Sequence, residues 1–322
     1  MTVASAPGKI ILFGEHAVVY GRPAIAVPVT QVHADVEVAE SSRPGIWIHA
    51  PNVDLDAELN TLPSDHPLAA VIHNLFFSLG ISPHPLPSPT GRGSKGEGLD
   101  ITINSTIPVA SGLGSGAAVS VALVRALSSA LGRPLSDDQV NAFAYEIERL
   151  HHGTPSGIDN TVITYASPVY FIKGHPIETL KVGRPFTLVI GDTGIPAPTK
   201  QSVGDVRRLW TKNNLRMEQV FDEVSQISLM ARRIIESGQP EMLGDLMNQN
   251  HAFLQEMTVS SQELDTLVRA ARAAGALGAK MSGGGRGGNM IALVDEANQD
   301  AVVAALIAAG ATKVIVTVIS GQ

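Results

Sequence analysis

The sequence predicts a mixed α and β chain that is divided into two α+β domains. Strand-like and helix-like stretches alternate along it, and three turns rich in glycine and small residues lie between them. The composition also shifts near residue 183, after which a mostly helical pattern follows. Because 322 residues suffice for two domains of ordinary size, we expect one domain over residues 1–182 and another over residues 183–322.

Composition narrows the class of protein. Hydrophobic residues make up 44% of the chain and aromatic residues only 4%, so Ala, Val, Ile and Leu must fill most of the core. The formal net charge of −7 argues against a general nucleic-acid binder. It leaves ATP open, because phosphates are usually held by local backbone N–H groups. The absence of cysteine excludes a disulfide scaffold, a thiol nucleophile and a cysteine-ligated metal.

The sequence has no pattern of a signal peptide or a membrane span. The apolar run Ile10–Phe13 has no basic segment before it and is too short. The apolar stretch Ala117–Leu131 contains Arg125 and several serines. We therefore expect a cytoplasmic protein that associates with neither membrane nor nucleic acid.

Periodicity and the positions of Gly and Pro predict the elements of residues 1–182. Turns are expected at Pro7-Gly8 and Gly21–Pro23, and segment 83–98, dense in Pro and Gly, is expected to be a flexible surface insertion. Strands are predicted where apolar residues run or alternate, over Ile10–Phe13, Ala24–Val29, Val32–Val38, Leu99–Ile107 and Val162–Ile172. Helices are predicted over residues 66–80, from Gly112–Gly116 to about Leu131, and over Ser136–Leu150.

The second half begins with a predicted strand, Thr187–Ile190. A helical pattern then runs from Asp205 to about Ala274, with breaks at Gly238–Pro240 and near Thr258. The chain is expected to end in a glycine-rich turn, a strand, a helix and a final strand, at Gly283–Gly288, Met290–Val294, Asn298–Ala309 and Lys313–Ile319.

The turn at Pro108–Ala118 has the clearest chemical signal. A strand ends, the glycines Gly112, Gly114 and Gly116 let the backbone curl tightly, and a helix begins. The free N–H groups and the positive dipole end of such a helix form an anion site. A strand–helix turn with glycines for packing alone fits the same residues, and no Walker motif is present.

The turn at Gly275–Gly288 contains a G-x-G-x-x-G string that would indicate a dehydrogenase if it were a dinucleotide fingerprint. That fingerprint needs a strand before it and a helix after it. Here a helical run rich in Ala and Arg leads into the turn and the strand-like Met290–Val294 follows it. We therefore reject the dehydrogenase interpretation.

An acidic segment, Glu146–Asn160, forms the next candidate. An acidic residue ends a helix, and a Gly/Pro/Ser turn then presents Asp159. Two carboxylates roughly a dozen residues apart can meet across such a turn, and a phosphoryl-transfer enzyme needs one to hold Mg²⁺ and another to orient or deprotonate the attacking hydroxyl. Adjacent His151 and His152 do not face one site on a helix, so we favour a structural or hydrogen-bonding role for them over metal ligation.

Together these motifs resemble the three signatures of the GHMP kinases. The matching segments are Ala6–Val19 (APGKIILFGEHAVV), Gly112–Ala118 (GLGSGAA) and Gly278–Gly285 (GAKMSGGG). Within this superfamily the chain is most similar to the mevalonate kinase family, through its opening segment, through HGTPSGIDN and through Gly191–Gly194 with Thr199-Lys200. The similarity runs over nearly the whole chain outside the insertion.

The resemblance implies a fold, an activity and an assembly. The fold would be the two-domain GHMP kinase fold, with a ribosomal protein S5 domain 2-like N-terminal domain, a ferredoxin-like C-terminal domain and the active site between them. The activity would be ATP-dependent phosphorylation of the mevalonate 5-hydroxyl, with ATP and Mg²⁺ as cofactors. The assembly would be a homodimer.

Carried over position by position, the resemblance also implies residue roles. Asp159 would orient the mevalonate hydroxyl or accept its proton, and Lys9 beside it would neutralise charge on the transferring phosphoryl group. Glu148 and Ser115 would hold Mg²⁺. The remaining residues would bind the two substrates, with Pro108, Ser111, Gly112, Leu113, Gly114, Ser115, Gly116 and Ala117 at the ATP phosphates and Glu15, His16, His152 and Thr199 at mevalonate.

Three residues depart from the family pattern. Gly116 stands where the family usually has a serine that helps to hold Mg²⁺, so Ser111, Ser115 or a water would have to substitute. Arg286 and Asn289 stand in the third signature, which is normally a run of small residues. We expect Arg286 to point to solvent rather than to a phosphate, because a bulky side chain would crowd the nucleotide.

Two alternatives remain at this point. The first is phosphomevalonate kinase or another GHMP kinase, for which Arg207 and Arg208 would serve a phosphorylated acceptor. The second is an ATP- or isoprenoid-binding homologue with weakened catalysis, suggested by Gly116 and Arg286. The presence of Lys9 and both carboxylates argues against the second alternative.

Overall fold

The computed structural model describes residues 1–81, 98–108, 111–152, 157–176 and 178–321, with only the backbone at 150–152. The chain forms two compact units, each made of separate segments of the sequence. The predicted boundary between residues 182 and 183 remains a prediction, because the units are defined by contacts in space. Unit 1 consists of Met1–Gly8, Val32–Ile107 and Ser115–Tyr165, and unit 2 consists of Lys9–Gln31, Pro108–Gly114 and Ala166–Gln322.

The sheet of unit 1 contains β4 (Leu55–Glu58), β3 (Ile46–Ala50), β5 (Gly98–Ser105) and the second half of β2 (Ala24–Ser41), in this order. Strand β3 runs parallel to β5, whereas β3 and β4, and β5 and β2, are antiparallel. Buried apolar residues alternate with more exposed ones along β2, so that its apolar face lies in the core. The short helices η2 (Pro51–Val53) and η3 (Leu59–Thr61) flank β4.

Four helices complete unit 1, and α2 (Ser115–Ala130) packs against the other three and against β5. Because α2 is buried on most sides, it consists almost wholly of small and aliphatic residues, as the low aromatic content predicts. The expected start of the next helix is confirmed by a capping box, in which Gln139 N donates to Ser136 Oγ at 3.4 Å and Ser136 N donates to Gln139 Oε1 at 2.9 Å. The other helices are α1 (Pro67–Leu79), α3 (Asp137–His152) and α4 (Ile158–Tyr165).

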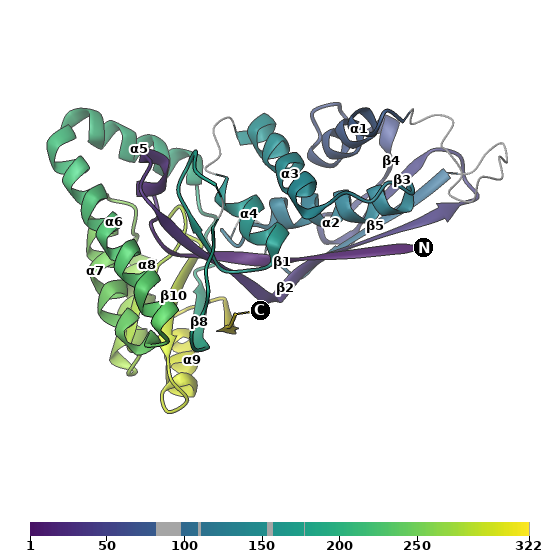
Figure 1. The fold of residues 1–322 in the computed structure, drawn as a ribbon. Helices are drawn as coiled ribbons and strands as arrows, with labels where there is room; N and C mark the ends of the chain where they lie inside the picture. Colours follow the sequence, from purple (N-terminus) through teal and green to yellow (C-terminus); the bar gives the residue numbers. More distant parts are fainter. Residues whose placement is uncertain (82–97, 109–110, 153–156, 177, 322) are drawn as a thin grey trace. The chain divides into compact units, whose positions relative to one another are not determined.

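Unit 2 contains an antiparallel sheet with the strand order β11-β8-β10-β9. Helices α7 and α8 pack on β9, α9 packs on β8 and β11, and the long α6 packs on α7 (Figure 1). The strands are β8 (Phe186–Asp192), β9 (Gly278–Met281), β10 (Asn289–Val294) and β11 (Lys313–Ile319). The helices are α5 (Thr199–Lys212), α6 (Asn214–Ser237), α7 (Leu243–Glu256), α8 (Gln262–Ala273) and α9 (Gln299–Ala308), with the short η4 (Pro240–Met242) before α7.

The remaining strands come from the first part of the chain, where β1 begins in unit 1 and ends in unit 2, and from its middle. Strand β1 (Thr2–Phe13) pairs with β2, and the first residues of β2 pair with β6 (Val169–Phe171), which pairs with β7 (Glu178–Thr179). The short helix η1 (Ala17–Tyr20) connects β1 to β2. No helix in the described part of the chain is long and apolar enough to cross a membrane.

Most predicted elements are confirmed, but the turn at Pro7-Gly8 is wrong because both residues lie inside β1. Among the described strands β1 pairs with β2 alone, and a proline is tolerated best in such an edge strand. The two strands predicted over Ala24–Val29 and Val32–Val38 form one strand, β2. The insertion predicted over 83–98 lies outside the described residues, except for Gly98 at the start of β5.

Two further predictions fail because tertiary packing overrides local preference. The strand predicted over Val162–Ile172 is helix α4 up to Tyr165, and only Val169–Phe171 is a strand. Asn160 on α4 donates to Asn141 Oδ1 on α3 at 2.6 Å, which fixes this helix despite its β-branched residues. The helical pattern begins earlier than predicted, at α5, and the run expected to stay helical into the third turn ends in strand β9.

Candidate active site

The predicted site residues fall in both units, and each unit is described in turn. Unit 2 contains Lys9, Glu15, His16, Thr199 and the loop residues Pro108 and Ser111–Gly114. Unit 1 contains Ser115–Ala117, Glu148 and Asp159. The side chain of His152 lies outside the described residues, although its backbone ends α3.

The first signature ends in a tight turn that presents His16. Gly14 has a φ of 94°, and a Cβ there would lie 2.4 Å from Pro23 O, so only glycine fits. His16 follows with a φ of 60°, a left-handed conformation that few non-glycine residues adopt. Its ring is buried, and Nε2 lies 3.1 Å from Gly284 O. Because a carbonyl oxygen only accepts, Nε2 must carry the proton and Nδ1 of the neutral ring is left as an acceptor.

His16 is held neutral by its surroundings. Burial lowers the pKa of His16 to about 4, the hydrogen bond to Gly284 opposes this shift, and the charge of Arg286 adds to it. The imidazole is therefore uncharged at pH 7. A neutral acceptor nitrogen suits a hydroxyl donor on a substrate.

A buried ion pair joins the first signature to the third. The ammonium of Lys280 on β9 contacts the carboxylate of Glu15, and both side chains are fully buried. Lys280 Nζ also donates to Met281 O at 2.8 Å, and Asn250 Nδ2 lies 3.5 Å from Glu15 Oε2. Burial lowers the pKa of Lys280, and the charge of Glu15 opposes that shift. The pair fixes the turn that contains His16, since a buried charge is stable only with its partner.

Sequence reasoning assigned no role to Lys280, although the residue stands within the quoted GAKMSGGG segment. The signal that could have indicated a role for it is the presence of a lysine within a segment of mostly small residues. The predicted contact of Glu15 with the acceptor stays a prediction, while its bond to Lys280 gives it a positioning role.

The third glycine-rich turn connects β9 to β10 and brings two predicted acceptor residues together. His16 bonds to Gly284 O, and a Cβ on Gly284 would lie 2.6 Å from Oγ1 of Thr199, the first residue of α5. Ser282 Oγ anchors the turn to β1 through a 2.7 Å bond to Ile11 O. His16 and Thr199 therefore both lie next to Gly284.

The same turn also supports the loop that is predicted to bind phosphate. Asn289 Nδ2 donates to Ser111 O at 2.6 Å, and Ser111 Oγ donates to Pro108 O at 2.9 Å. Lys9, which is buried, donates its backbone N–H to Leu113 O at 2.9 Å. Asn289, one of the departures from the family pattern, thus has a structural role in holding this loop.

On either side of buried Leu113, the loop is open at Gly112 and at Gly116. A Cβ added at Gly112 or at Gly116 would meet no atom within 4 Å. Helix α2 begins at Ser115 and is 16 residues long, so its first N–H groups and its positive dipole end lie at the loop. A helix start of this kind can bind an anion, and position 116 has room for a hydroxyl.

The two predicted carboxylates of unit 1 lie at helix ends. Glu148 lies in the last turns of α3 and Asp159 in the first turn of α4, and both are half-buried. The sequence predicted that a turn presents Asp159; helix α4 does so instead. Helices α3 and α4 pack together.

The donors present suit Mg²⁺. Glu148 and Ser115 both offer oxygen ligands, which this ion prefers. No three His, Cys, Asp or Glu residues form a metal cluster in the described part of the chain. Such a cluster is not required, because Mg²⁺ in kinases is usually bound by one or two carboxylates together with nucleotide phosphates.

The expectation that Arg286 points to solvent is wrong. Its guanidinium forms an ion pair with Asp205 on α5, and its Nε and Nη2 each lie 3.3 Å from Thr258 O. The sequence alone did not place Asp205 near the turn, because the two residues lie far apart along the chain.

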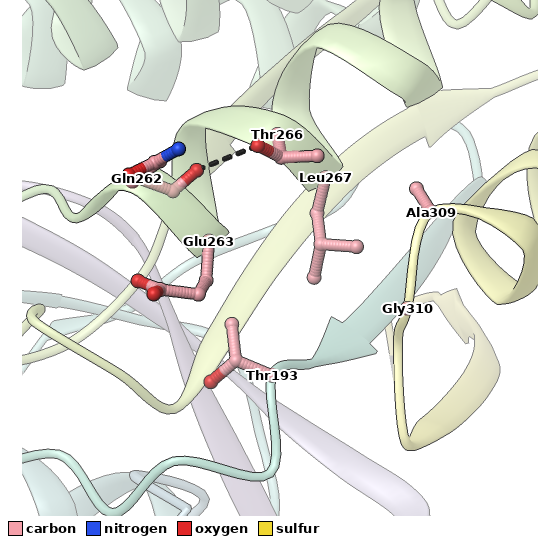
Figure 2. A pocket seen from close by; sticks show the side chains of 7 residues that line it. All are labelled: Thr193, Gln262, Glu263, Thr266, Leu267, Ala309 and Gly310. Carbon is pink, nitrogen blue, oxygen red and sulfur yellow. Dashed lines mark hydrogen bonds between the residues drawn. The ribbon is translucent and has the colours of Figure 1, made fainter.

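A cavity of about 280 Å³ lies in unit 2 (Figure 2). It is lined by the first turns of α8, by Thr193 after β8 and by Ala309-Gly310 after α9. No predicted site residue lines it. Its one charged lining residue is Glu263, so it is unfavourable for a phosphate.

Two domain families match this chain: GHMP kinases N terminal domain over residues 88–167 and GHMP kinases C terminal over residues 231–312. The mevalonate kinase of Pyrococcus horikoshii is 35% identical to the chain, over 96% of it and 93% of that relative. The chain belongs to the GHMP kinases. Membership confirms the predicted two-domain α+β fold and makes the protein a kinase that uses ATP.

Further members of this family match over similar lengths. The mevalonate kinase of Thermococcus onnurineus is 37% identical, over 97% of this chain and 95% of that relative. Among solved structures, L. major mevalonate kinase in complex with R-mevalonate matches with a TM-score of 0.84 and 29% identity, covering 100% of this chain and 97% of that one.

Proposed function

We propose that the protein transfers the γ-phosphoryl group of ATP to the 5-hydroxyl of mevalonate, giving 5-phosphomevalonate and ADP. The observation that carries this proposal is that His16 and Thr199 both lie next to Gly284 in the third glycine-rich turn. It occurs in a chain that is similar over nearly its whole length to GHMP kinases named as mevalonate kinases.

The acceptor is recognised by groups that suit hydroxyls. Neutral His16 offers Nδ1 as an acceptor, and Thr199 offers a hydroxyl that both donates and accepts. Thr199 is exposed at the start of α5, which supports its access to a substrate. The buried Glu15–Lys280 pair keeps this half of the site rigid and so favours a pre-organised acceptor.

Phosphoryl transfer requires in-line positioning and neutralisation of charge, with little covalent chemistry by the protein. Asp159 orients the acceptor hydroxyl and takes its proton. Lys9 stabilises charge on the transferring group, and residues 111–117 with the start of α2 hold the ATP phosphates. Glu148 and Ser115 hold Mg²⁺, which when bound neutralises charge on the phosphates.

The assembly and location complete the proposal. We propose a homodimer in the cytoplasm, following the family resemblance. Size-exclusion chromatography with light scattering tests the dimer, and cell fractionation tests the location.

Phosphomevalonate is a weaker candidate acceptor. Arg208 pairs with Asp205 on its own helix and is 75% exposed, so it has the setting of a solvated surface side chain. Arg207 is also exposed. No contact of either arginine favours a phosphorylated acceptor over mevalonate.

A coupled ADP-release assay separates these functions. The enzyme with ATP and Mg²⁺ is given mevalonate, phosphomevalonate or no acceptor, and the product is identified by mass spectrometry. We expect ADP release that depends on mevalonate and yields a monophosphate ester. Release with phosphomevalonate alone would assign the second function, and no release with either acceptor would contradict both.

A further inference from the structure

Arg286 occupies a costly backbone position in the third turn. Its φ is 59°, in the left-handed region, which glycine adopts without strain and which costs energy for a residue with a side chain. It lies within a run of glycines from Gly283 to Gly288. A residue that accepts such strain normally makes contacts that offset it.

Those contacts cross-link three segments of unit 2. The guanidinium pairs with the carboxylate of Asp205 on α5 and donates to Thr258 O in the connection between α7 and α8. The backbone N–H of Arg286 donates to Val259 O at 2.8 Å in the same connection. The ion pair is partly buried, with 27% of the Arg286 side chain and 13% of the Asp205 side chain exposed, so solvent weakens it less than a surface pair.

The cross-link lies close to the acceptor residues. Asp205 stands within two turns of Thr199 on α5, and Arg286 stands two positions after Gly284, next to which Thr199 and His16 both lie. Helix α5 buries few of its own residues, Ser202 and Val206 among them. The helix also packs on α6 and Gly288 N donates to Ile195 O just before it, and the Asp205–Arg286 pair adds the side-chain link between α5 itself and the third turn.

We propose that Arg286 is a positioning residue for the acceptor: its ion pair with Asp205 fixes α5 against the third glycine-rich turn and so places Thr199 and His16. This inference rests on the proposed function, since those two residues are the proposed acceptor contacts. Arg286 itself touches neither acceptor nor nucleotide.

The electrostatics of His16 point the same way. Arg286 is the charged group whose field acts on the pKa of His16; the adjacent Glu15 is paired with Lys280, and Arg286 itself is paired with Asp205. Arg286 adds to the effect of burial and lowers the pKa of His16. Loss of the arginine should therefore raise that pKa as well as release α5.

Arg286→Gln and Arg208→Gln form a matched test. Each removes one positive charge that contacts Asp205, but Arg208 lies on α5 itself and cannot join that helix to the turn. We expect Arg286→Gln to raise KM for mevalonate by about tenfold and to change KM for ATP by less than about twofold. Arg208→Gln should change neither by more than about twofold. Arg286→Lys, which keeps the charge, should recover most of the loss.

Three results would overturn the proposal. An equal rise in KM for ATP in Arg286→Gln would assign the arginine to the nucleotide. Equal effects of the two glutamine variants would reduce its role to net charge. An acidic limb of the kcat/KM profile that moves to higher pH in both variants, rather than in Arg286→Gln alone, would also remove the specific link to His16.

Hydrogen exchange tests the cross-link without any turnover. Amides of residues 195–205 should exchange faster in Arg286→Gln and in Arg286→Gly than in Arg208→Gln or the parent enzyme. The glycine variant adopts the same φ without strain, so it stays informative if the glutamine variant folds poorly. Unchanged exchange would overturn the cross-link, whereas a parent enzyme inactive on mevalonate would instead overturn the proposed function.

Discussion

The glycine-rich turn before α2 and the one between β9 and β10 look alike in sequence, but their surroundings differ. A Cβ at Gly112 or Gly116 in the first of these would meet nothing within 4 Å. In the other, a Cβ at Gly284 would lie 2.6 Å from Thr199 Oγ1, and one at Gly285 would lie 2.0 Å from Val259 O. The first turn is open at both of these glycines, whereas the second is packed at Gly284, Gly285, Gly287 and Gly288 and open only at Gly283 among its glycines.

The difference shows that glycine has two uses in one enzyme. In the open turn, the missing side chains leave space and bare N–H groups for an anion. In the packed turn, they let backbone segments approach more closely than any side chain allows. We therefore expect substitutions around the open turn to change turnover or metal use, and substitutions in the packed turn to change stability first.

The largest effect should come from the carboxylate proposed for chemistry. Asp159→Asn removes the proton acceptor and should lower kcat by about 10³-fold, since general-base groups contribute about 10²–10⁴-fold. The melting temperature should change little, because the side chain is half-buried and keeps its shape. Glu146→Gln, an exposed carboxylate on α3, is the control and should keep normal activity. Near-normal turnover in Asp159→Asn would contradict the catalytic role.

The next effect compares the two turns directly. Gly285→Ala forces a Cβ against Val259 O at a φ of 78° and should cost on the order of 3 kcal/mol of unfolding free energy. Gly116→Ala meets open space at a helix start and should change stability by less than about 0.5 kcal/mol, or raise it. Urea denaturation measures both. Similar losses in the two variants would break the distinction between open and packed turns.

Acid should lower the free energy of unfolding through two buried histidines, His16 and His251. Burial lowers the pKa of His16 and of His251, which accepts a bond from Met281 N on β9, to about 4 in each case. The unfolded chain binds these protons near pH 6.5, so the stabilising contribution is present above that pH and is lost as pH falls toward 4. For His16 the loss at pH 4.5 should be about 2 kcal/mol.

Denaturation of the parent enzyme and of His251→Gln at several pH values between 4.5 and 7.5 measures this dependence. In the variant, the free energy of unfolding should rise less steeply with pH than in the parent enzyme. The reason is that the variant lacks one of the two histidines that bind a proton on unfolding in this pH range. If the free energy of unfolding depends on pH identically in the two proteins, groups other than His251 cause the loss of stability in acid.

The smallest effect should come from restoring a hydroxyl to the open turn. Gly116→Ser has room for its side chain and should lower the Mg²⁺ concentration for half-maximal rate by a few-fold, about 1 kcal/mol, without a change in stability. Gly116→Ala is the control for the added Cβ. A rise in the Mg²⁺ requirement would mean that the space at this position is used by another ligand.

Much of the fold could be predicted because its signals are local. The end of the chain, from the glycine-rich turn through β10 and α9 to β11, follows from apolar periodicity and glycine positions, and its elements are confirmed nearly residue by residue. The capping box at Ser136 can likewise be predicted from the sequence, because a glutamine follows the serine three positions later. The failures occurred where distant contacts decide, as in α4, whose β-branched residues are buried against α2 and α3 and whose Asn160 bonds to α3.

By itself the sequence determined the three signatures and hence the kinase family, because those turns need glycine and small residues at fixed spacing. Only the tertiary structure decided what Asn289, Lys280 and Arg286 contact. Asn289 supports the phosphate loop through Ser111 O, Lys280 neutralises buried Glu15, and Arg286 reaches Asp205 instead of solvent. The partner of a side chain depends on which distant segments of the chain fold beside it. The spacing of residues within a motif does not indicate those segments.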